Sequence, residues 1–312
     1  MFHKILFFYT VRYLVPHLPH WVLMKIAEVT GSINKKGARA EITQQQLRRL
    51  LGDAISDEEI NRIALESMRS FHKDLFEIWC FPTLTKNKIE KIAPLKGREH
   101  LDDALRQGKG AIIGVTHFGS WKILIAALGY AGYRTNQIAV NPLDFDNEND
   151  TIINNKIMRL EYECERSLPV RFIYIGRFMR QVYQALENNE VVIMSMDGVA
   201  RRREKAFKLL NTTSALDVSP LKFALKNKIP YLPTFAVRGK DNRHSVVIHN
   251  PLELSNSKGM PVPLDQVFSD YIKIFEQHVR EHPSHYARSL YVFATRWGKH
   301  VYHPDSDLKK EI

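Results

Sequence analysis

The segment Gly110–Lys122, GAIIGVTHFGSWK, constrains the fold of this 312-residue chain more than any other. Its apolar, β-branched run Ala111–Thr116 predicts a buried strand, whereas Trp121–Tyr130 predicts a helix. His117 therefore stands where a strand ends and a helix begins, the position at which open α/β sheets form their binding crevices. A histidine at such a position can act as a general base on a hydroxyl near neutral pH.

Strand-like and helix-like segments alternate from residue 111 onward. This alternation predicts an α/β fold with a mixed, mainly parallel sheet flanked by helices. The expected strands are 111–116, 137–140, 171–175, 191–196, 231–237 and 245–248. The expected helices are 121–130, 147–163, 177–187, 218–227 and 265–281.

The chain before residue 95 is expected to be helical and to fall into two parts. Residues 1–33 hold two short aromatic and basic segments, separated by Pro16 and Pro19, and no run of about 20 apolar residues that a membrane-spanning helix needs. They predict an interfacial membrane anchor or, alternatively, a helical hairpin packed on the protein's own core. A cleaved signal peptide is not expected, since no small-residue cleavage site follows a long apolar core.

Residues 34–94 are expected to form a helical region without chemistry of its own. Ser56 and Glu59 make a capping box ahead of apolar residues at helical spacing. A proline-bounded linker over residues 82–94 then leads into an α/β domain over residues 95–312.

The residues around His117 carry a resemblance to a known family. His117-Phe-Gly-Ser-Trp-Lys122 resembles the His-Phe-Gly-Asn-Trp-Glu motif of the late lipid A acyltransferases, the lauroyl and myristoyl transferases of the glycerolipid acyltransferase superfamily. A similar segment lies just upstream, at residues 97–110, and others follow in order at residues 190–197, 207–210, 220–238 and 286–297. The similarity therefore covers nearly the whole chain.

The resemblance implies an O-acyltransferase at the cytoplasmic face of a Gram-negative inner membrane. Such an enzyme moves a fatty acyl chain from acyl carrier protein or acyl-CoA to a hydroxyl of a lipid A precursor or related glycolipid, with no metal and no cofactor. His117 then corresponds to the family's base, which takes the proton from the acceptor hydroxyl. The competing hypothesis is a catalytically impaired or non-enzymatic lipid-binding member of the same fold.

Lys122 departs from the family's pattern, because the family has a carboxylate there that holds the imidazole in place. Three interpretations follow: the lysine points away while another carboxylate supports His117, it binds a phosphate or sugar acid, or catalysis has been lost. Asp197, after the expected strand 191–196, should lie at the same sheet edge as His117 and can orient it. The alternative for Asp197 is a helix or turn cap.

Three arginines join Lys122 as candidate substrate-binding residues. Arg159 suits a phosphate through its bidentate guanidinium, although an ion pair with Glu163 is an equal alternative. Arg177 follows a glycine at a strand-to-helix turn, where helix N-termini favour anions. Arg201 opens the basic run 201–205, either solvated surface or a contact for lipid headgroups or an acidic carrier.

The formal net charge of +11 favours acidic partners. An anionic membrane surface or an acidic carrier protein fits better than nucleic acid, for which no binding signature is present. Two cysteines, Cys80 and Cys164, indicate neither a disulfide framework nor a zinc site. Residues 211–217 are expected to be a loop that caps the next helix, and Arg296 with Trp297 a structural contact.

Overall fold

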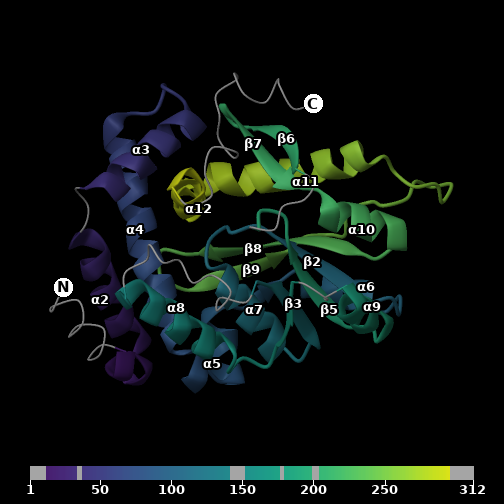
Figure 1. Ribbon diagram of the computed structural model, residues 1–312, viewed down its shortest axis with the longest axis horizontal. Coiled ribbons are helices and arrows are strands. Elements are labelled where there is room, and N and C mark those ends of the chain that lie inside the picture. Colours follow the sequence, from purple (N-terminus) through teal and green to yellow (C-terminus); the bar gives the residue numbers. More distant parts are fainter. Residues whose placement is uncertain (1–11, 34–36, 141–151, 176–178, 199–203, 296–312) are drawn as a thin grey trace.

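The computed structural model describes residues 12–33, 37–140, 152–175, 179–198 and 204–295. In this part of the chain, seven strands form a central sheet in the order β1-β9-β8-β2-β5-β3-β4. Every neighbouring pair is parallel except β8 and β9, so the sheet is mixed and mainly parallel, as predicted. Helices cover both of its faces, with α10, α11 and α12 on one side and α5 and α7 on the other (Figure 1).

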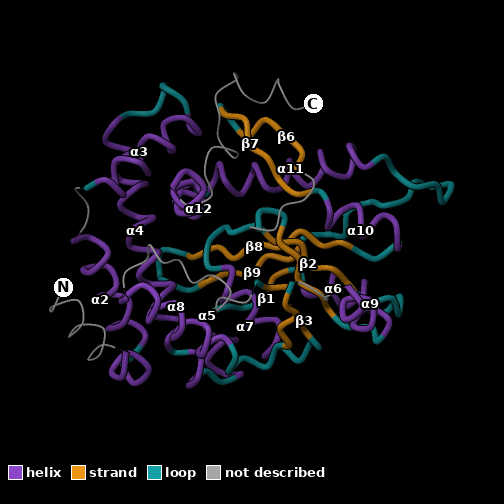
Figure 2. The backbone as a smooth tube through the Cα atoms, viewed as in Figure 1, coloured by secondary structure: helices purple, strands orange, loops and turns teal. Residues whose placement is uncertain are grey.

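The strands of the sheet are β1 (Leu95–Lys96), β2 (Ala111–Val115), β3 (Thr135–Ala139), β4 (Arg171–Tyr174), β5 (Val191–Ser195), β8 (Tyr231–Arg238) and β9 (His244–Ile248). A separate antiparallel hairpin is made by β6 (Glu204–Leu209) and β7 (Thr212–Asp217). Figure 2 shows the sheet at the centre and the hairpin beside α11.

The helical elements are η1 (Val15–His17), α2 (His20–Ile33), α3 (Ala38–Leu51), α4 (Asp57–Trp79), η2 (Phe81–Thr83), α5 (Lys86–Ile92), α6 (Arg98–Leu105), α7 (Trp121–Tyr130), α8 (Ile152–Glu165), α9 (Met179–Glu187), α10 (Ser219–Asn227), α11 (Leu264–Glu281) and α12 (Pro283–Thr295).

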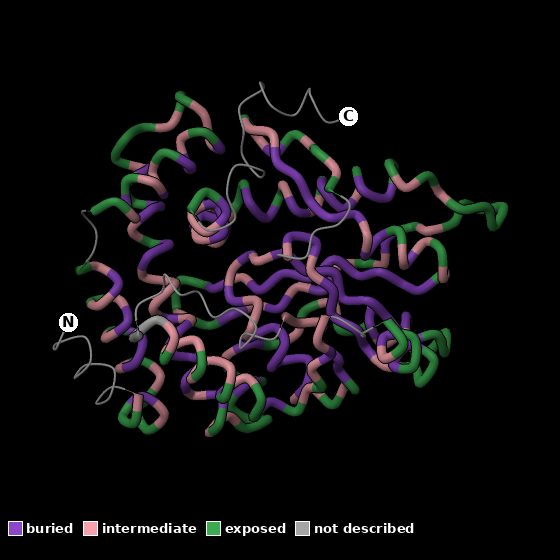
Figure 3. The backbone as a smooth tube through the Cα atoms, viewed as in Figure 1, coloured by how far each residue is buried: buried purple, intermediate pink, exposed green. Residues whose placement is uncertain are grey.

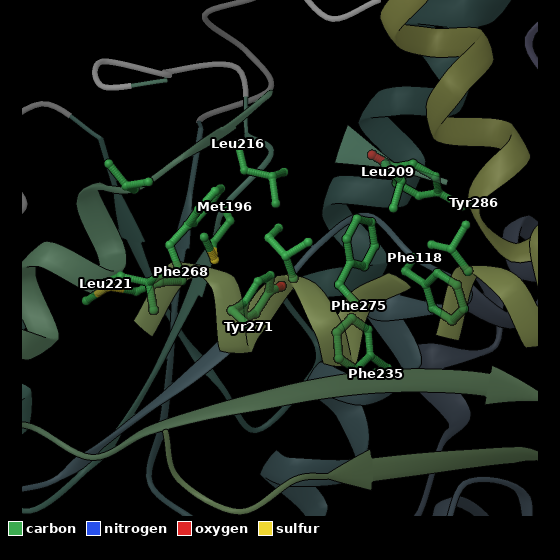
Figure 4. Close-up of a cluster of buried hydrophobic side chains, with 14 of the residues drawn as sticks. Phe118, Met196, Leu209, Leu216, Leu221, Phe235, Phe268, Tyr271, Phe275 and Tyr286 are labelled. Carbon is green, nitrogen blue, oxygen red and sulfur yellow. The ribbon is translucent and has the colours of Figure 1, made fainter. Parts of the chain in front are cut away.

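Alternation along the buried strands divides the interior into two apolar cores. In β2, Ile112 belongs to the core shared with α9 to α12, while Ile113 and Val115 belong to the core shared with α5, α6 and α7. Because parallel strands are covered on both faces, β2 and β5 are apolar nearly throughout, and the backbone at the centre of the sheet is buried (Figure 3). Aromatic rings fill the first core, where Phe235 stacks on Phe275 (Figure 4).

Helix α4 connects the N-terminal helices to the rest of the molecule. It packs against both α2 and α12. The Ser56 side chain accepts a hydrogen bond from the Glu59 N–H, so the Ser56 half of the predicted capping box is present at its start. The Glu59 carboxylate accepts hydrogen bonds from Arg62 instead. Gly31 allows the close approach of α2, because a Cβ there would lie 2.7 Å from the Arg69 Cα.

Several elements differ from the prediction. The expected linker over residues 82–94 contains η2 and the helix α5, whose start is capped by Thr85. The expected loop over residues 211–217 is strand β7, although Asp217 still accepts from the Ser219 N–H at the start of α10. The elements β1, α6 and α12 were not anticipated either. The hairpin escaped prediction because its first strand carries charged residues that face solvent.

The predicted anchor over residues 1–33 falls partly outside the described residues, which begin at residue 12. Helix α2 buries Leu23, Met24 and Ala27 against α4 and exposes Trp21, Val29 and Ile33 on its other side. None of the described helices is both long and apolar enough to cross a bilayer.

Candidate active site

Two neighbouring strands place His117 and Asp197 together. Strands β2 and β5 pair in parallel, with Val115 opposite Ser195 at their carboxyl ends. His117 and Asp197 each follow two residues beyond that pair, so both emerge at the same edge of the sheet. This is the edge at which parallel α/β sheets commonly form their ligand sites.

The Asp197 carboxylate contacts His117 at two points. Its Oδ1 lies 2.8 Å from the His117 ring Nδ1, and its Oδ2 accepts a 2.8 Å hydrogen bond from the His117 backbone N–H. The Ser195 hydroxyl also donates to Oδ1, at 2.7 Å. Because an ionised carboxylate can only accept, Nδ1 carries the ring hydrogen in the neutral imidazole. The arrangement fixes both the tautomer and the orientation of the ring.

Burial and charge together set the ionisation of Asp197. Its side chain is only 1% exposed, and burial alone would raise the pKa of the carboxyl. The attraction of His117 and the hydrogen bonds from His117 and Ser195 outweigh burial and lower the pKa of Asp197 below its ordinary value. The carboxylate is therefore ionised at neutral pH. The His117 side chain, by contrast, is 30% exposed and borders a cavity.

The turn after His117 depends on Gly119. Its φ of +57° lies in the left-handed region, and a Cβ would lie 2.0 Å from the Ala236 carbonyl oxygen. The Gly119 N–H donates to the His285 carbonyl at 3.0 Å, and the Ser289 hydroxyl donates to the His117 carbonyl. Helix α12 thus holds the turn that carries His117.

A cavity of about 240 Å³ opens beside His117. Its walls come from α4, the start of α7 and α12, and are lined by Ser67, Ser70, Phe71, Asp74, His117, Gly119, Ser120, Trp121, Lys122, Arg238, Ser284, His285, Arg288, Ser289, Val292 and Phe293. The Trp121 ring meets the His117 ring edge-on, with centroids 4.9 Å apart. The cavity is smaller than the roughly 300–1,000 Å³ of typical ligand pockets, so it suits one part of a large substrate.

Lys122 makes its ion pairs with α8. Its Nζ lies 2.8 Å from Glu161 Oε2 and also contacts the Glu165 carboxylate, and its side chain is 19% exposed. Burial alone would lower the pKa of Lys122, but the two carboxylates raise it above its ordinary value. Of the three interpretations offered by the sequence, this geometry corresponds to the first, with Asp197 as the carboxylate beside His117.

Of the three candidate arginines, only Arg159 falls among the described residues. Arg159 is exposed on α8. Arg177 and Arg201 lie outside the described residues, as do Arg296 and Trp297.

A buried ionic cluster near the site was missed from the sequence. Arg238, on β8, donates to the Asp74 carboxylate at 2.6 Å and to the Glu77 carboxylate at 2.7 Å. His244 lies 3.1 Å from Glu77, and Ser120 donates to Asp74. The two carboxylates stand three residues apart on α4, a helical spacing that places them on one face. Their spacing could have indicated a pair of carboxylates on one side of α4. It could not have indicated that Arg238 is their partner.

The two cysteines form no disulfide with each other. Cys80 and Cys164 are both free thiols. Among the described residues, no group of three or more His, Cys, Asp or Glu side chains is arranged to hold a metal ion.

A mainly parallel sheet that carries a histidine–carboxylate pair at its carboxyl edge is the α/β architecture expected of glycerolipid acyltransferases. The family model of bacterial lipid A biosynthesis acyltransferases matches residues 4–295. The chain belongs to this family, which implies acyltransferase activity with an acyl donor and a lipid acceptor. A search of curated proteins found no match.

Proposed function

We propose that this protein transfers a fatty acyl chain from an acyl thioester to a hydroxyl of a lipid A precursor or related glycolipid. The observation that carries the proposal is the contact between His117 Nδ1 and Asp197 Oδ1 at the border of the cavity. It supplies an oriented base although Lys122 replaces the family's carboxylate. The donor is acyl carrier protein or acyl-CoA, since both present the acyl group as a thioester.

The proposed reaction is a direct transfer with His117 as general base. With Nδ1 bonded to Asp197, the Nε2 atom takes the proton from the acceptor hydroxyl as its oxygen attacks the thioester carbonyl carbon. A C–O bond forms, the C–S bond breaks, and the leaving thiolate takes the proton from the imidazolium. The negative charge of Asp197 stabilises that imidazolium while it exists. No protein nucleophile is acylated in this scheme.

The proposed place of the reaction is the cytoplasmic face of the inner membrane. The exposed side of α2 presents Trp21, Val29 and Ile33, and the chain has a formal net charge of +11. Exposed aromatic and aliphatic groups on a protein of net basic charge favour binding to an anionic bilayer surface. Binding at the surface would bring the protein to a lipid-embedded acceptor.

The test is acyl transfer by the full-length protein in detergent or vesicles, with mass spectrometry of the acceptor lipid. We expect wild type to add one acyl chain and His117→Ala to lose roughly 10²–10⁴-fold in rate, the usual contribution of general-base catalysis. The control His17→Ala changes an exposed histidine and should leave the rate unchanged. A wild type inert with all lipid A precursors and both donors would favour the lipid-binding hypothesis, and full activity of His117→Ala would exclude His117 as the base.

A further inference from the structure

Arg288 occupies the wall of the cavity beside His117. It lies on α12, one turn beyond Ser284, and both residues line the cavity. Its guanidinium lies over the Phe71 ring, with Cζ 4.4 Å from the ring centroid. The Arg39 guanidinium lies at the same distance from that ring. Two cations thus flank one aromatic side chain at the edge of the site.

Arg288 differs from the other cationic side chains that line the cavity in its ion pairing. Lys122 is matched by Glu161 and Glu165, and Arg238 is matched by Asp74 and Glu77. Within the described parts of the chain, no carboxylate forms an ion pair with Arg288. An anionic group that enters this cavity therefore meets one cation whose charge the protein has not already balanced.

The neighbouring side chains suit an oxygen-rich anion. Ser67 and Ser70 on α4 border the cavity with Ser284 on α12. Within the described residues, neither the Ser67 nor the Ser70 hydroxyl forms a hydrogen bond. A hydroxyl donates to a phosphate oxygen and a guanidinium binds two of them at once. The stacking on Phe71 also preorganises the guanidinium, which lowers the entropy lost when it binds.

We propose that Arg288 binds a phosphate group of one of the two substrates while their reacting groups meet at His117. This inference rests on the proposed acyl transfer and adds that the enzyme recognises a phosphate group of one substrate. The same chemistry has two sources: a sugar phosphate of the acceptor, or the phosphate of a phosphopantetheine donor. Arg288 is a binding residue in this account and takes no part in moving the proton.

The inference is tested by binding, without any turnover. Ligand-observed NMR on the full-length protein in detergent compares glucosamine 1-phosphate with glucosamine, and 4′-phosphopantetheine with pantetheine. Arg288→Gln should weaken binding of one phosphorylated probe roughly 10- to 100-fold, the range for a charged hydrogen bond, and leave its phosphate-free counterpart unchanged. The probe that loses affinity identifies the source of the phosphate.

Two further variants separate recognition from folding. Arg288→Lys keeps the charge but loses the planar fork, so it should retain part of the affinity. Arg280→Gln removes an arginine on α11 that pairs with Glu276 outside the cavity, and it should bind like wild type. The inference is overturned if wild type binds neither phosphorylated probe better than its counterpart, or if Arg288→Gln binds both as wild type does. A wild type that binds a phosphate but transfers no acyl chain would count against the proposed reaction alone.

Discussion

His117 and Asp197 lie 80 residues apart in the chain and meet through two hydrogen bonds, one from the ring Nδ1 and one from the backbone N–H, each of 2.8 Å. Both bonds follow from the register of β2 and β5, whose ends are paired at Val115 and Ser195. The carboxylate therefore fixes the turn as well as the ring. An oriented imidazole at this edge does not depend on the residue at position 122.

Asp197→Asn tests whether catalysis depends on the Asp197 carboxylate. The amide has almost the same shape, but it lacks the negative charge and permits the wrong imidazole tautomer. We expect kcat to fall roughly 10³–10⁴-fold while the KM values change little, by analogy with the effect of such a replacement in serine protease triads. Steady-state kinetics of acyl transfer measures both constants.

A surface substitution controls for the loss of a carboxylate elsewhere. Asp270→Asn changes a partly exposed residue of α11 and should leave kcat within about twofold of wild type. Circular dichroism must show the same fold for both variants. Activity of Asp197→Asn equal to that of wild type would exclude the carboxylate from catalysis.

Lys122→Glu is expected to damage the protein, although it recreates the carboxylate of the family motif. The new side chain would stand beside Glu161 and Glu165 in a largely buried site, replacing two attractions by two repulsions. Breaking a buried ion pair costs about 3–5 kcal/mol, and partial exposure reduces this to an expected loss of about 2–4 kcal/mol. Urea denaturation measures the change in unfolding free energy.

Reversal of both charges provides the matched control. When Lys122→Glu is combined with Glu161→Lys, the lysine introduced on α8 can contact both the glutamate introduced on α7 and the native Glu165. We therefore expect most of the lost stability to return. The exposed change Lys222→Glu should cost less than about 0.5 kcal/mol. If the single variant is as stable as wild type and more active, Lys122 does not have the structural role assigned to it.

The parallel strands were predictable because they are buried on both faces. Ala111–Val115 and Val191–Ser195 are almost wholly apolar, and such runs between helices indicate strands without any knowledge of their partners. The prediction also placed His117 and Asp197, which follow these two strands, at the same edge of the sheet.

The hairpin was missed because the exposed side of Glu204–Leu209 includes the charged Glu204 and Lys208, so the segment lacks an apolar run. Its antiparallel partner, β7, had been predicted as a loop that caps the next helix.

The ion-pair partners of Lys122 and Arg238 could not be predicted from the sequence. Glu161 and Glu165 share one face of α8, whereas Arg159 and Glu163 share another. Local spacing allows either face to lie against α7, and only the tertiary packing brings Glu161 to Lys122, 39 residues earlier. For the same reason, Arg238 was not expected beside Asp74, 164 residues away.

His278 predicts a dependence of stability on pH. Burial, followed by the nearby His249, lowers the pKa of His278 to about 4, from about 6.5 for an unperturbed histidine. Between these values the unfolded chain binds a proton that the folded protein excludes, so stability falls as pH drops from about 6.5 toward 4. The contribution at pH 4 is roughly 2–3 kcal/mol, since one pKa unit corresponds to about 1.36 kcal/mol.

Urea denaturation at pH 7, 5.5 and 4.5 measures this dependence. His278→Phe removes the titrating group from an aromatic site, where the centroids of the imidazole and Phe235 rings lie 4.4 Å apart, and should make the pH profile less steep. The partly buried His72 and His285, whose pKa values are also lowered, should keep the rest of the slope. His17→Asn, at an exposed position, should keep the wild-type profile. An unchanged slope in His278→Phe would assign the acid sensitivity to other groups.

The exposed side of α2 predicts binding to anionic membranes. Trp21, Val29 and Ile33 stand at helical spacings and are 71%, 65% and 72% exposed, while the opposite side of the helix packs on α4. Replacing all three by serine removes apolar contact without touching the core, so we expect at least roughly tenfold weaker binding to vesicles that contain phosphatidylglycerol. Met260→Ser, which changes an exposed methionine elsewhere, should bind as wild type does in the same flotation assay. Equal flotation of the triple variant would assign membrane binding to another surface, because no comparable apolar contact would remain on α2.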